Sequence, residues 1–125
     1  MKLKRVGFFF ELSPVDRRRE LILLRRESAS DHEPQIVNYL LHGAPCAAIP
    51  ELEEDVLQTP PIAIGCPHLL TDGTWTWPQT LRYYVEKYHI ELPNDFIDHM
   101  RRYNWECKRE ALVLNPQIEG HVSMG

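Results

Sequence analysis

The alternation of apolar and polar residues is clearest at 68–77, where it predicts a β-hairpin. An Asp-Gly pair at 72–73 is typical of a two-residue hairpin turn. With that pair at the tip, Leu70 would lie opposite Trp75, and His68 would lie opposite Trp77. These four side chains would then share one face of the hairpin, which we expect to be the core face.

Four other segments have the spacing of amphipathic helices, because their apolar residues recur three or four positions apart. Ser13 and Asp31 are residue types that cap a helix N-terminus. Pro78 and Pro93 are of the type favoured at the first helical position. The predicted helices are 14–27, 33–42, 78–89 and 93–103.

The rest of the chain has weaker patterns. Residues 4–12 alternate, apart from Phe9, and predict a strand of the same sheet. The other candidates are a short strand at 46–49, a helical turn at 51–57, an apolar run at 62–64, a strand within 105–114 and a loose tail at 118–125. Together these elements predict a single α+β domain over residues 1–125, in which a small antiparallel sheet packs against four helices.

Composition places the chain among soluble proteins of one domain. It has 125 residues, of which 43% are hydrophobic and 26% are charged. No apolar run approaches the roughly 20 residues that span a bilayer, and no signal cleavage site follows the basic N-terminus. Cys46, Cys66 and Cys107 are odd in number and widely spaced, which is typical of free thiols. We therefore expect a cytoplasmic protein with no membrane association.

Charge is distributed unevenly along the chain. Residues 31–98 carry eleven Asp and Glu against two Lys and Arg, and the densest run is 51–55. An acidic middle argues against nucleic acid as the main ligand, because neutralising phosphates requires basic side chains. The same charge would suit a basic protein partner. The alternative is that the run is simply solvated.

Candidate chemistry is sparse. The sequence has no phosphate-binding loop, nucleophile elbow or zinc-protease motif. Cys66 and His68 are the only nucleophile and base that lie close together in the sequence, and the hairpin pairing makes His68 a core or rim residue instead. We therefore predict no catalytic residues, no metal and no cofactor.

A longer motif surrounds the predicted hairpin. Residues 70–78 read LTDGTWTWP, residues 81–89 read LRYYVEKYH, and Leu92, Pro93 and Phe96 follow. This core resembles that of small uncharacterised bacterial proteins with the pattern TDGxWxWPxxLxYYVEKYHxxLPxxF, a family of unknown function. The similarity covers about residues 6–105. It implies a bacterial, cytoplasmic protein, and it implies no activity.

These observations predict a small protein-binding module. We expect an immunity protein that neutralises a toxin, such as a nuclease, through an acidic surface, because charge complementarity speeds such association and sets its specificity. The alternatives are a nucleic-acid-binding protein that uses the arginine-rich helix Arg17–Arg26, and a non-catalytic protein of another role. The predicted partner-binding residues are Glu51, Glu53, Glu54, Asp55, Tyr83, Glu91, Asp95 and Asp98.

Overall fold

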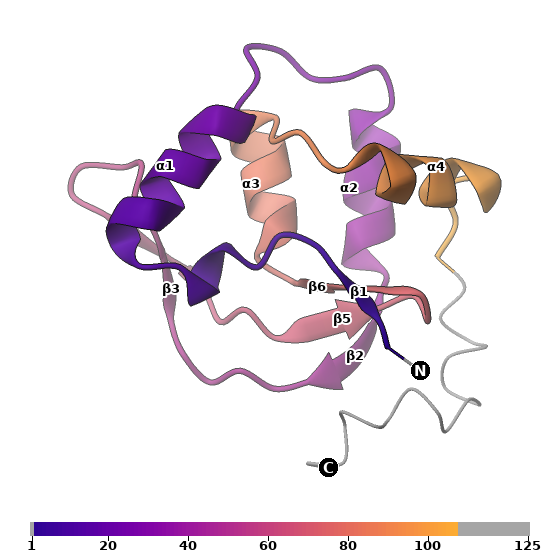
Figure 1. Ribbon diagram of the computed structural model, residues 1–125, viewed down its shortest axis with the longest axis horizontal. Coiled ribbons are helices and arrows are strands. Elements are labelled where there is room, and N and C mark those ends of the chain that lie inside the picture. Colours follow the sequence, from indigo (N-terminus) through magenta and orange to yellow (C-terminus); the bar gives the residue numbers. More distant parts are fainter. Residues whose placement is uncertain (1, 108–125) are drawn as a thin grey trace.

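A computed structural model describes residues 2–107, in which four α-helices accompany a four-stranded sheet and a separate two-stranded sheet (Figure 1). The elements are β1 Lys4–Arg5, the 3-10 helix η1 Phe9–Glu11, α1 Pro14–Leu24, α2 Glu33–Leu41, β2 Ala44–Ala47, β3 Glu53–Asp55, β4 Ile62–Gly65, β5 Leu69–Thr71, β6 Trp75–Pro78, α3 Leu81–Tyr88 and α4 Asn94–Arg102. The α+β class is confirmed. The predicted strand within 105–114 and the tail 118–125 lie wholly or largely outside the described residues.

The larger sheet is mixed, with the order β1-β6-β5-β2. β1 runs parallel to β6, whereas the other neighbours are antiparallel. In Figure 1 these strands cross the lower part of the molecule, and α1, α2 and α3 stand above them. No helix in this part of the chain has both the length and the apolar character needed to cross a membrane.

The hairpin is confirmed, but its register differs from the prediction. Leu70 pairs with Trp77 and Thr71 with Thr76, so the tip lies one residue later than expected. The carboxylate of Asp72 causes this shift, since its Oδ1 accepts the backbone N–H groups of Thr74 at 2.9 Å and Trp75 at 2.7 Å. The pairing moves by an even number of residues, so each predicted side chain keeps its face.

The N-terminal strand is much shorter than the predicted 4–12. Gly7 has a φ of +76°, which turns the chain out of the extended conformation after β1. A Cβ at this position would lie 2.7 Å from Cδ1 of Leu81, so the backbone passes directly over α3. The following residues wind into η1 and bury Phe9, whose ring meets that of Tyr84 edge to face.

Helix boundaries also differ from the predictions in ways that the contacts explain. Ser13 caps α1 as expected, with its Oγ accepting the N–H of Asp16 at 3.2 Å. α1 ends at Leu24 instead of 27, because the Leu24 carbonyl accepts the N–H of Glu91. The residue at the N-cap of α2 is His32 and not the predicted Asp31, and no side chain caps that helix.

α3 and α4 begin later than the sequence suggested. Pro78 still belongs to β6, where it pairs with Leu69, so α3 starts at Leu81. His89 ends this helix in the left-handed conformation, with a φ of 54°. α4 follows at Asn94, one residue after the predicted start at Pro93.

The segment 44–67, whose pattern was mixed, forms three strands. β2 overlaps the strand predicted at 46–49, and β4 contains the apolar run at 62–64. The predicted helical turn at 51–57 is wrong, because β3 occupies its centre. Glu53 and Asp55 are both buried and Glu54 between them is exposed, which is the period of a strand.

The core lies between the larger sheet and the helices, around Trp77. This side chain is fully buried, and its Nε1 donates a 3.0 Å hydrogen bond to the carbonyl of Leu40. Its ring packs on those of Tyr39 and Phe96, which come from α2 and α4. The hairpin therefore joins the sheet to two helices.

Candidate functional site

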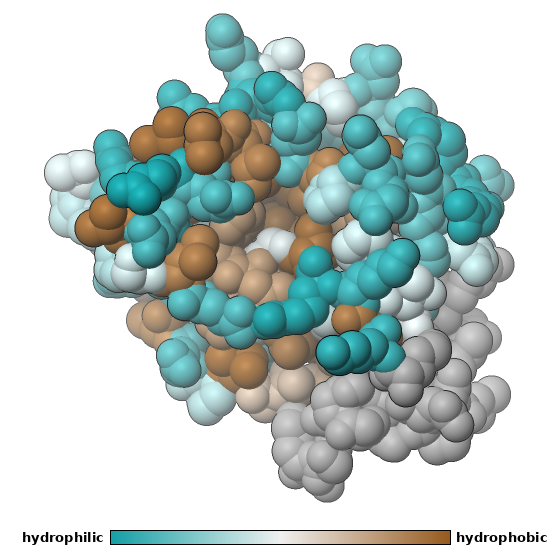
Figure 2. All heavy atoms as spheres, in the orientation of Figure 1, coloured by the Kyte–Doolittle hydropathy of each residue, from teal (hydrophilic) through white to brown (hydrophobic). Residues whose placement is uncertain are grey.

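An open groove of about 660 Å³ is the leading candidate for a binding site. It lies between the N-terminal segment 5–12, α1, and the link that joins α3 to α4. Figure 2 shows apolar surface gathered around this hollow, with hydrophilic groups at its rim. The lining residues are Arg5, Val6, Gly7, Phe8, Phe9, Leu12, Glu20, Leu24, Glu91, Leu92, Pro93 and Asn94.

The apolar floor of the groove is part of the protein core. Val6, Phe9 and Leu92 are buried members of the hydrophobic cluster, and Leu12 and Leu24 pack against it while remaining partly accessible. Such a floor is held in place by the rest of the fold, so the groove does not need a ligand to form. A preformed apolar groove favours the binding of an apolar group, because that group leaves water.

Backbone hydrogen bonds join two walls of the groove, the end of α1 and the link between α3 and α4. The N–H of Glu91 donates to the Leu24 carbonyl at 2.9 Å, and the N–H of Arg26 donates to the Tyr88 carbonyl at 3.2 Å. The Arg26 guanidinium also pairs with the Glu91 carboxylate. These contacts hold the end of α1 against the link between α3 and α4.

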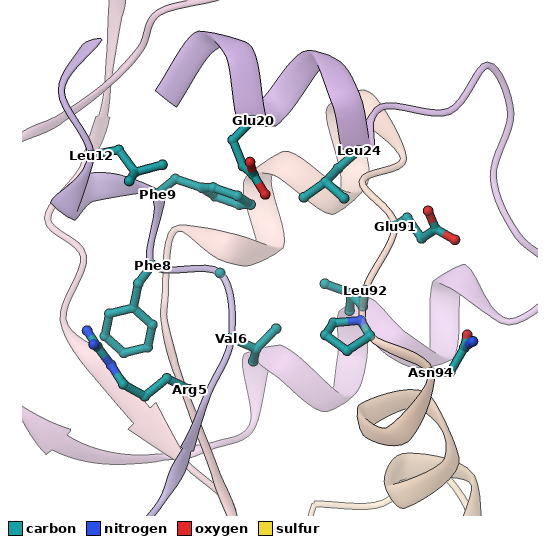
Figure 3. A pocket seen from close by; sticks show the side chains of 12 residues that line it. Arg5, Val6, Phe8, Phe9, Leu12, Glu20, Leu24, Glu91, Leu92 and Asn94 are labelled. Atoms are coloured by element: carbon teal, nitrogen blue, oxygen red, sulfur yellow. The ribbon is translucent and has the colours of Figure 1, made fainter. Parts of the chain in front are cut away.

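Most charges around the groove are already paired. Arg5 donates to Glu11 at 2.6 Å, and its guanidinium carbon lies 3.8 Å from the centre of the Phe8 ring. Glu20 differs, because it makes no hydrogen bond or ion pair within residues 2–107. In Figure 3 its carboxylate extends from α1 into the groove, between Phe9 and Leu24. The groove therefore combines an apolar floor with one uncompensated negative charge.

The acidic run 51–55 does not form the single exposed surface that the sequence suggested. Glu51 and Glu54 are exposed, whereas Glu53 and Asp55 retain only 3% and 0% of their accessible surface. The prediction that all four carboxylates face a partner is therefore wrong for Glu53 and Asp55. Alternation along β3 directs both of them inward, against α3.

Tyrosines of α3 hold these two buried carboxylates. Tyr83 and Tyr88 donate to Oδ2 of Asp55 at 2.7 and 2.6 Å. Tyr84 donates to Oε2 of Glu53 at 2.6 Å. Thr80, just before α3, donates to the other oxygen of Glu53 at 2.6 Å, and the N–H of Leu57 donates to Oδ1 of Asp55 at 2.9 Å. We call this group the tyrosine–carboxylate cluster. It joins the β3–β4 sheet to α3.

The cluster also changes how its tyrosines titrate. Burial, followed by the hydrogen bond to Asp55, raises the pKa of both Tyr83 and Tyr88. Burial and the charge of Glu53 raise the pKa of Tyr84. The hydroxyls therefore remain donors well into alkaline solution. Tyr83, predicted as a partner anchor, is half-buried and bound to Asp55 instead of projecting freely.

The second predicted acidic group is only partly available. Glu91 pairs with Arg26, and Asp98 pairs with Arg101 at 3.2 Å. Asp95 is exposed in the first turn of α4, and it makes no hydrogen bond or ion pair within the described part of the chain. The structure places Glu91 in the wall of the groove, so this residue belongs to the candidate site for a different reason from the one predicted.

The arginine-rich helix is largely committed to the fold. Arg17 donates to the carbonyls of four residues, and Arg18 donates to the carbonyl of Val56 at 3.2 Å. Arg19 pairs with Asp16 at 3.5 Å. These contacts weaken the case for a nucleic-acid surface, which needs several arginines free to neutralise phosphates. The four residues that Arg17 contacts are Phe9, Phe10, Leu12 and Glu54.

Within residues 2–107, the histidine and cysteine side chains do not assemble into a recognisable reactive site. Nδ1 of His68 accepts the N–H of Ile49 at 2.9 Å, which accounts for this histidine without Cys66. Cys46 is buried, and burial raises the pKa of its thiol. Among residues 2–107, no group of three or more His, Cys, Asp or Glu side chains could hold a metal ion.

Two histidine–carboxylate pairs were not foreseen from the sequence. Nε2 of His99 lies 3.1 Å from Oδ2 of Asp72, and His99 is buried. Nδ1 of His89 lies 3.0 Å from both carboxylate oxygens of Glu33. The partners are 27 and 56 positions apart, and no local spacing signals a contact of that range.

In comparisons with known proteins, no family model, no curated protein and no solved structure matches the chain. The resemblance of residues 70–96 to small bacterial proteins therefore stays a prediction. The groove and the charges around it are the basis for the function proposed next.

Proposed function

We propose that this protein is a non-catalytic protein-binding module of the immunity type, which binds and blocks a basic partner such as a toxin domain. The observation that carries this proposal is the apolar groove with the uncompensated carboxylate of Glu20 at its wall. Interfaces are held by apolar anchors in preformed pockets, and surrounding charges select the partner. The exposed acids Glu51, Glu54 and Asp95 add to the negative potential that would attract a basic protein.

The proposal moves the contact surface away from the one the sequence suggested. Because Glu53 and Asp55 are buried and bonded to tyrosines of α3, they are not part of the proposed contact surface. The groove supplies the apolar contact area that an acidic surface alone would lack. Affinity would then come from the groove, and fast association from the acidic residues.

A pair of neighbouring leucines tests the proposal. Leu24 lines the groove, whereas Leu23 is exposed on the same helix and does not line it. Tagged wild-type protein, Leu24→Ser and Leu23→Ser would be used to capture partners from the native cell at moderate salt. We expect a stoichiometric basic protein with the wild type and with Leu23→Ser, and at least tenfold less of it with Leu24→Ser. Circular dichroism would establish that all three are folded.

The captured partner must also be harmful when it is free. Its gene, expressed alone in a heterologous host, is expected to stop growth, and co-expression of the wild-type module is expected to restore growth. A partner that is harmless alone would contradict the immunity role. Equal capture by Leu24→Ser and Leu23→Ser would contradict the groove as the binding site.

A further inference from the structure

We propose that the groove takes one arginine or lysine side chain of the partner, with its aliphatic stem on the apolar floor and its charge against Glu20. This inference rests on the proposed function and adds the chemistry of recognition. It makes Glu20 the residue that determines specificity. A basic side chain fits because it is apolar along its stem and charged at its tip, as the groove is apolar at its floor and charged at its wall.

The position of Glu20 follows from the geometry of α1. Glu20 and Leu24 are four residues apart and share one face of the helix, and Leu21 beside them is fully buried. That face meets η1, so the Glu20 side chain extends over the groove, as Figure 3 shows. The carboxylate is exposed to solvent and lies between Phe9 and Leu24, so a cation that reaches it also meets apolar side chains.

Within residues 2–107, three arginines on α1 or around the groove are engaged elsewhere. Arg17, one turn before Glu20, is held by backbone carbonyls of the 9–12 segment and of Glu54. Arg5, which lines the groove, pairs with Glu11, and Arg26, which follows α1, pairs with Glu91. The Glu20 charge is therefore left for a group that comes from outside residues 2–107.

The size of the groove agrees with a side chain and its immediate neighbours. About 660 Å³ lies in the range of pockets that enclose small organic groups. The groove is open along one side, so a segment of a larger protein can reach it (Figure 2). The negative charge at the wall favours a basic segment over an acidic or neutral one.

The test uses short peptides, and so it does not depend on finding the natural partner. Two capped peptides would have arginine or citrulline at the centre of an otherwise identical Gly-Leu-X-Leu-Gly sequence, since citrulline keeps the shape and loses the charge. We expect the arginine peptide to shift amide NMR signals of groove residues in the full-length protein, and the citrulline peptide to bind about tenfold more weakly. Added salt should narrow this difference.

Two variants locate the effect. Glu20→Gln is expected to abolish the preference for arginine over citrulline, whereas Glu27→Gln is expected to keep it, because Glu27 does not line this groove. Three results would overturn the inference: equal binding of both peptides, a preference that survives Glu20→Gln, or no binding at millimolar peptide. It would also be overturned if the groove signals shift with protein concentration alone, which would assign the groove to a second copy of the chain.

The inference and the proposed function can fail separately. If capture of a toxic partner depends on Leu24 but is unchanged by Glu20→Gln, the proposed function stands and the binding of a basic side chain at Glu20 is excluded. If the groove binds the arginine peptide selectively but the protein neutralises no partner, recognition of a basic side chain stands and the immunity role is excluded.

Discussion

The hydroxyl of Tyr88 donates a 2.6 Å hydrogen bond to the fully buried carboxylate of Asp55, 33 positions earlier in the chain. No Lys, Arg or His side chain pairs with Asp55 within residues 2–107, so neutral donors stabilise the charge. A buried carboxylate persists only where hydrogen bonds replace its hydration. The contact thus binds the β3–β4 sheet to α3, and Arg17 and Arg18 of α1 donate to the carbonyls of the neighbouring Glu54 and Val56.

The first prediction concerns the loss of this carboxylate. Asp55→Ala would leave the donors of Tyr83, Tyr88 and Leu57 without their acceptor, so we expect the free energy of unfolding to fall by about 3 kcal/mol. Urea denaturation followed by circular dichroism would measure it. The exposed neighbour Glu54→Ala should change stability by no more than about 0.5 kcal/mol. Similar losses for both variants would contradict the role assigned to the cluster.

The second prediction is the alkaline pH dependence of stability. Burial raises the pKa of Tyr39, Tyr83, Tyr84 and Tyr88 above the ordinary value of 10.0. The unfolded chain therefore loses these protons at lower pH than the folded protein does. Stability from the tyrosines is fully present below about pH 10 and falls as the pH rises above it.

Urea denaturation at a series of alkaline pH values would measure this fall. Tyr84→Phe should be less stable than the wild type at neutral pH, and it should lose stability less steeply above about pH 10, since one titrating group is gone. An identical slope in wild type and variant would exclude Tyr84 from the effect.

The third prediction separates backbone strain from crowding. Gly7 and Gly65 both have positive φ, at +76° and +121°, but only Gly7 has a neighbour where a Cβ would lie. Gly65→Ala is expected to cost about 1 kcal/mol through backbone strain alone. Gly7→Ala should cost about 2–4 kcal/mol, because its methyl group would also displace Leu81.

Thermal unfolding of the two glycine variants in parallel would measure both costs. Gly7→Ala should also alter the groove, since the 5–12 segment forms one of its walls. If Gly65→Ala proves as destabilising as Gly7→Ala, the close passage over α3 contributes nothing measurable.

The fourth prediction concerns the hairpin tip. Asp72 accepts from the N–H groups of Thr74 and Trp75 with one oxygen and contacts Tyr39 and His99 with the other. Asp72→Ala should therefore lower the free energy of unfolding by about 3 kcal/mol. It should also change the tryptophan fluorescence, because Trp75 packs on Phe96 of α4 beside this turn.

A matched acidic variant provides the control. Asp95→Ala removes an exposed carboxylate from the first turn of α4, where the helix dipole makes it worth about 0.3–1 kcal/mol. Asp72→Ala should lower the free energy of unfolding by clearly more than Asp95→Ala does. A loss no greater than that of Asp95→Ala would mean that the turn keeps its shape without the carboxylate.

Several elements were predictable because their causes are local. The spacing in 81–88 and 94–102 is that of one-sided helices, and both helices are present. The two tryptophans of the hairpin were assigned to the core, and both are buried. Ser13 was expected to cap α1, and it does so.

The misplaced elements depend on distant partners. The 51–57 segment contains four acids and was expected to be exposed, yet β3 buries Glu53 and Asp55 because three tyrosines from α3 reach them. The 4–12 segment alternates like a strand, but Gly7 turns the chain over Leu81. Neither contact has a signature in the neighbouring sequence.

The residues of the candidate site also divide into those that the sequence predicted and those that depend on distant contacts. The sequence predicted an exposed acidic surface that included Glu91, which does line the groove, but the predicted residues did not include Glu20. Glu20 becomes distinctive only when its helix packs against η1 and the neighbouring arginines are taken up by carbonyls and carboxylates.

The sequence by itself determined the α+β class, the hairpin and the buried face of α3, because these follow from periodicity and turn residues within a few positions of one another. It did not determine the buried face of α1, where Val15 and Ile22 are exposed and only Leu21 is buried. Only the tertiary structure decided which charges are buried, which are paired and which remain available, because charge pairing depends on side chains brought together from positions far apart in the chain. Glu20 and Asp55 are both carboxylates in that sequence, and packing alone leaves the first in an open groove and encloses the second among tyrosines.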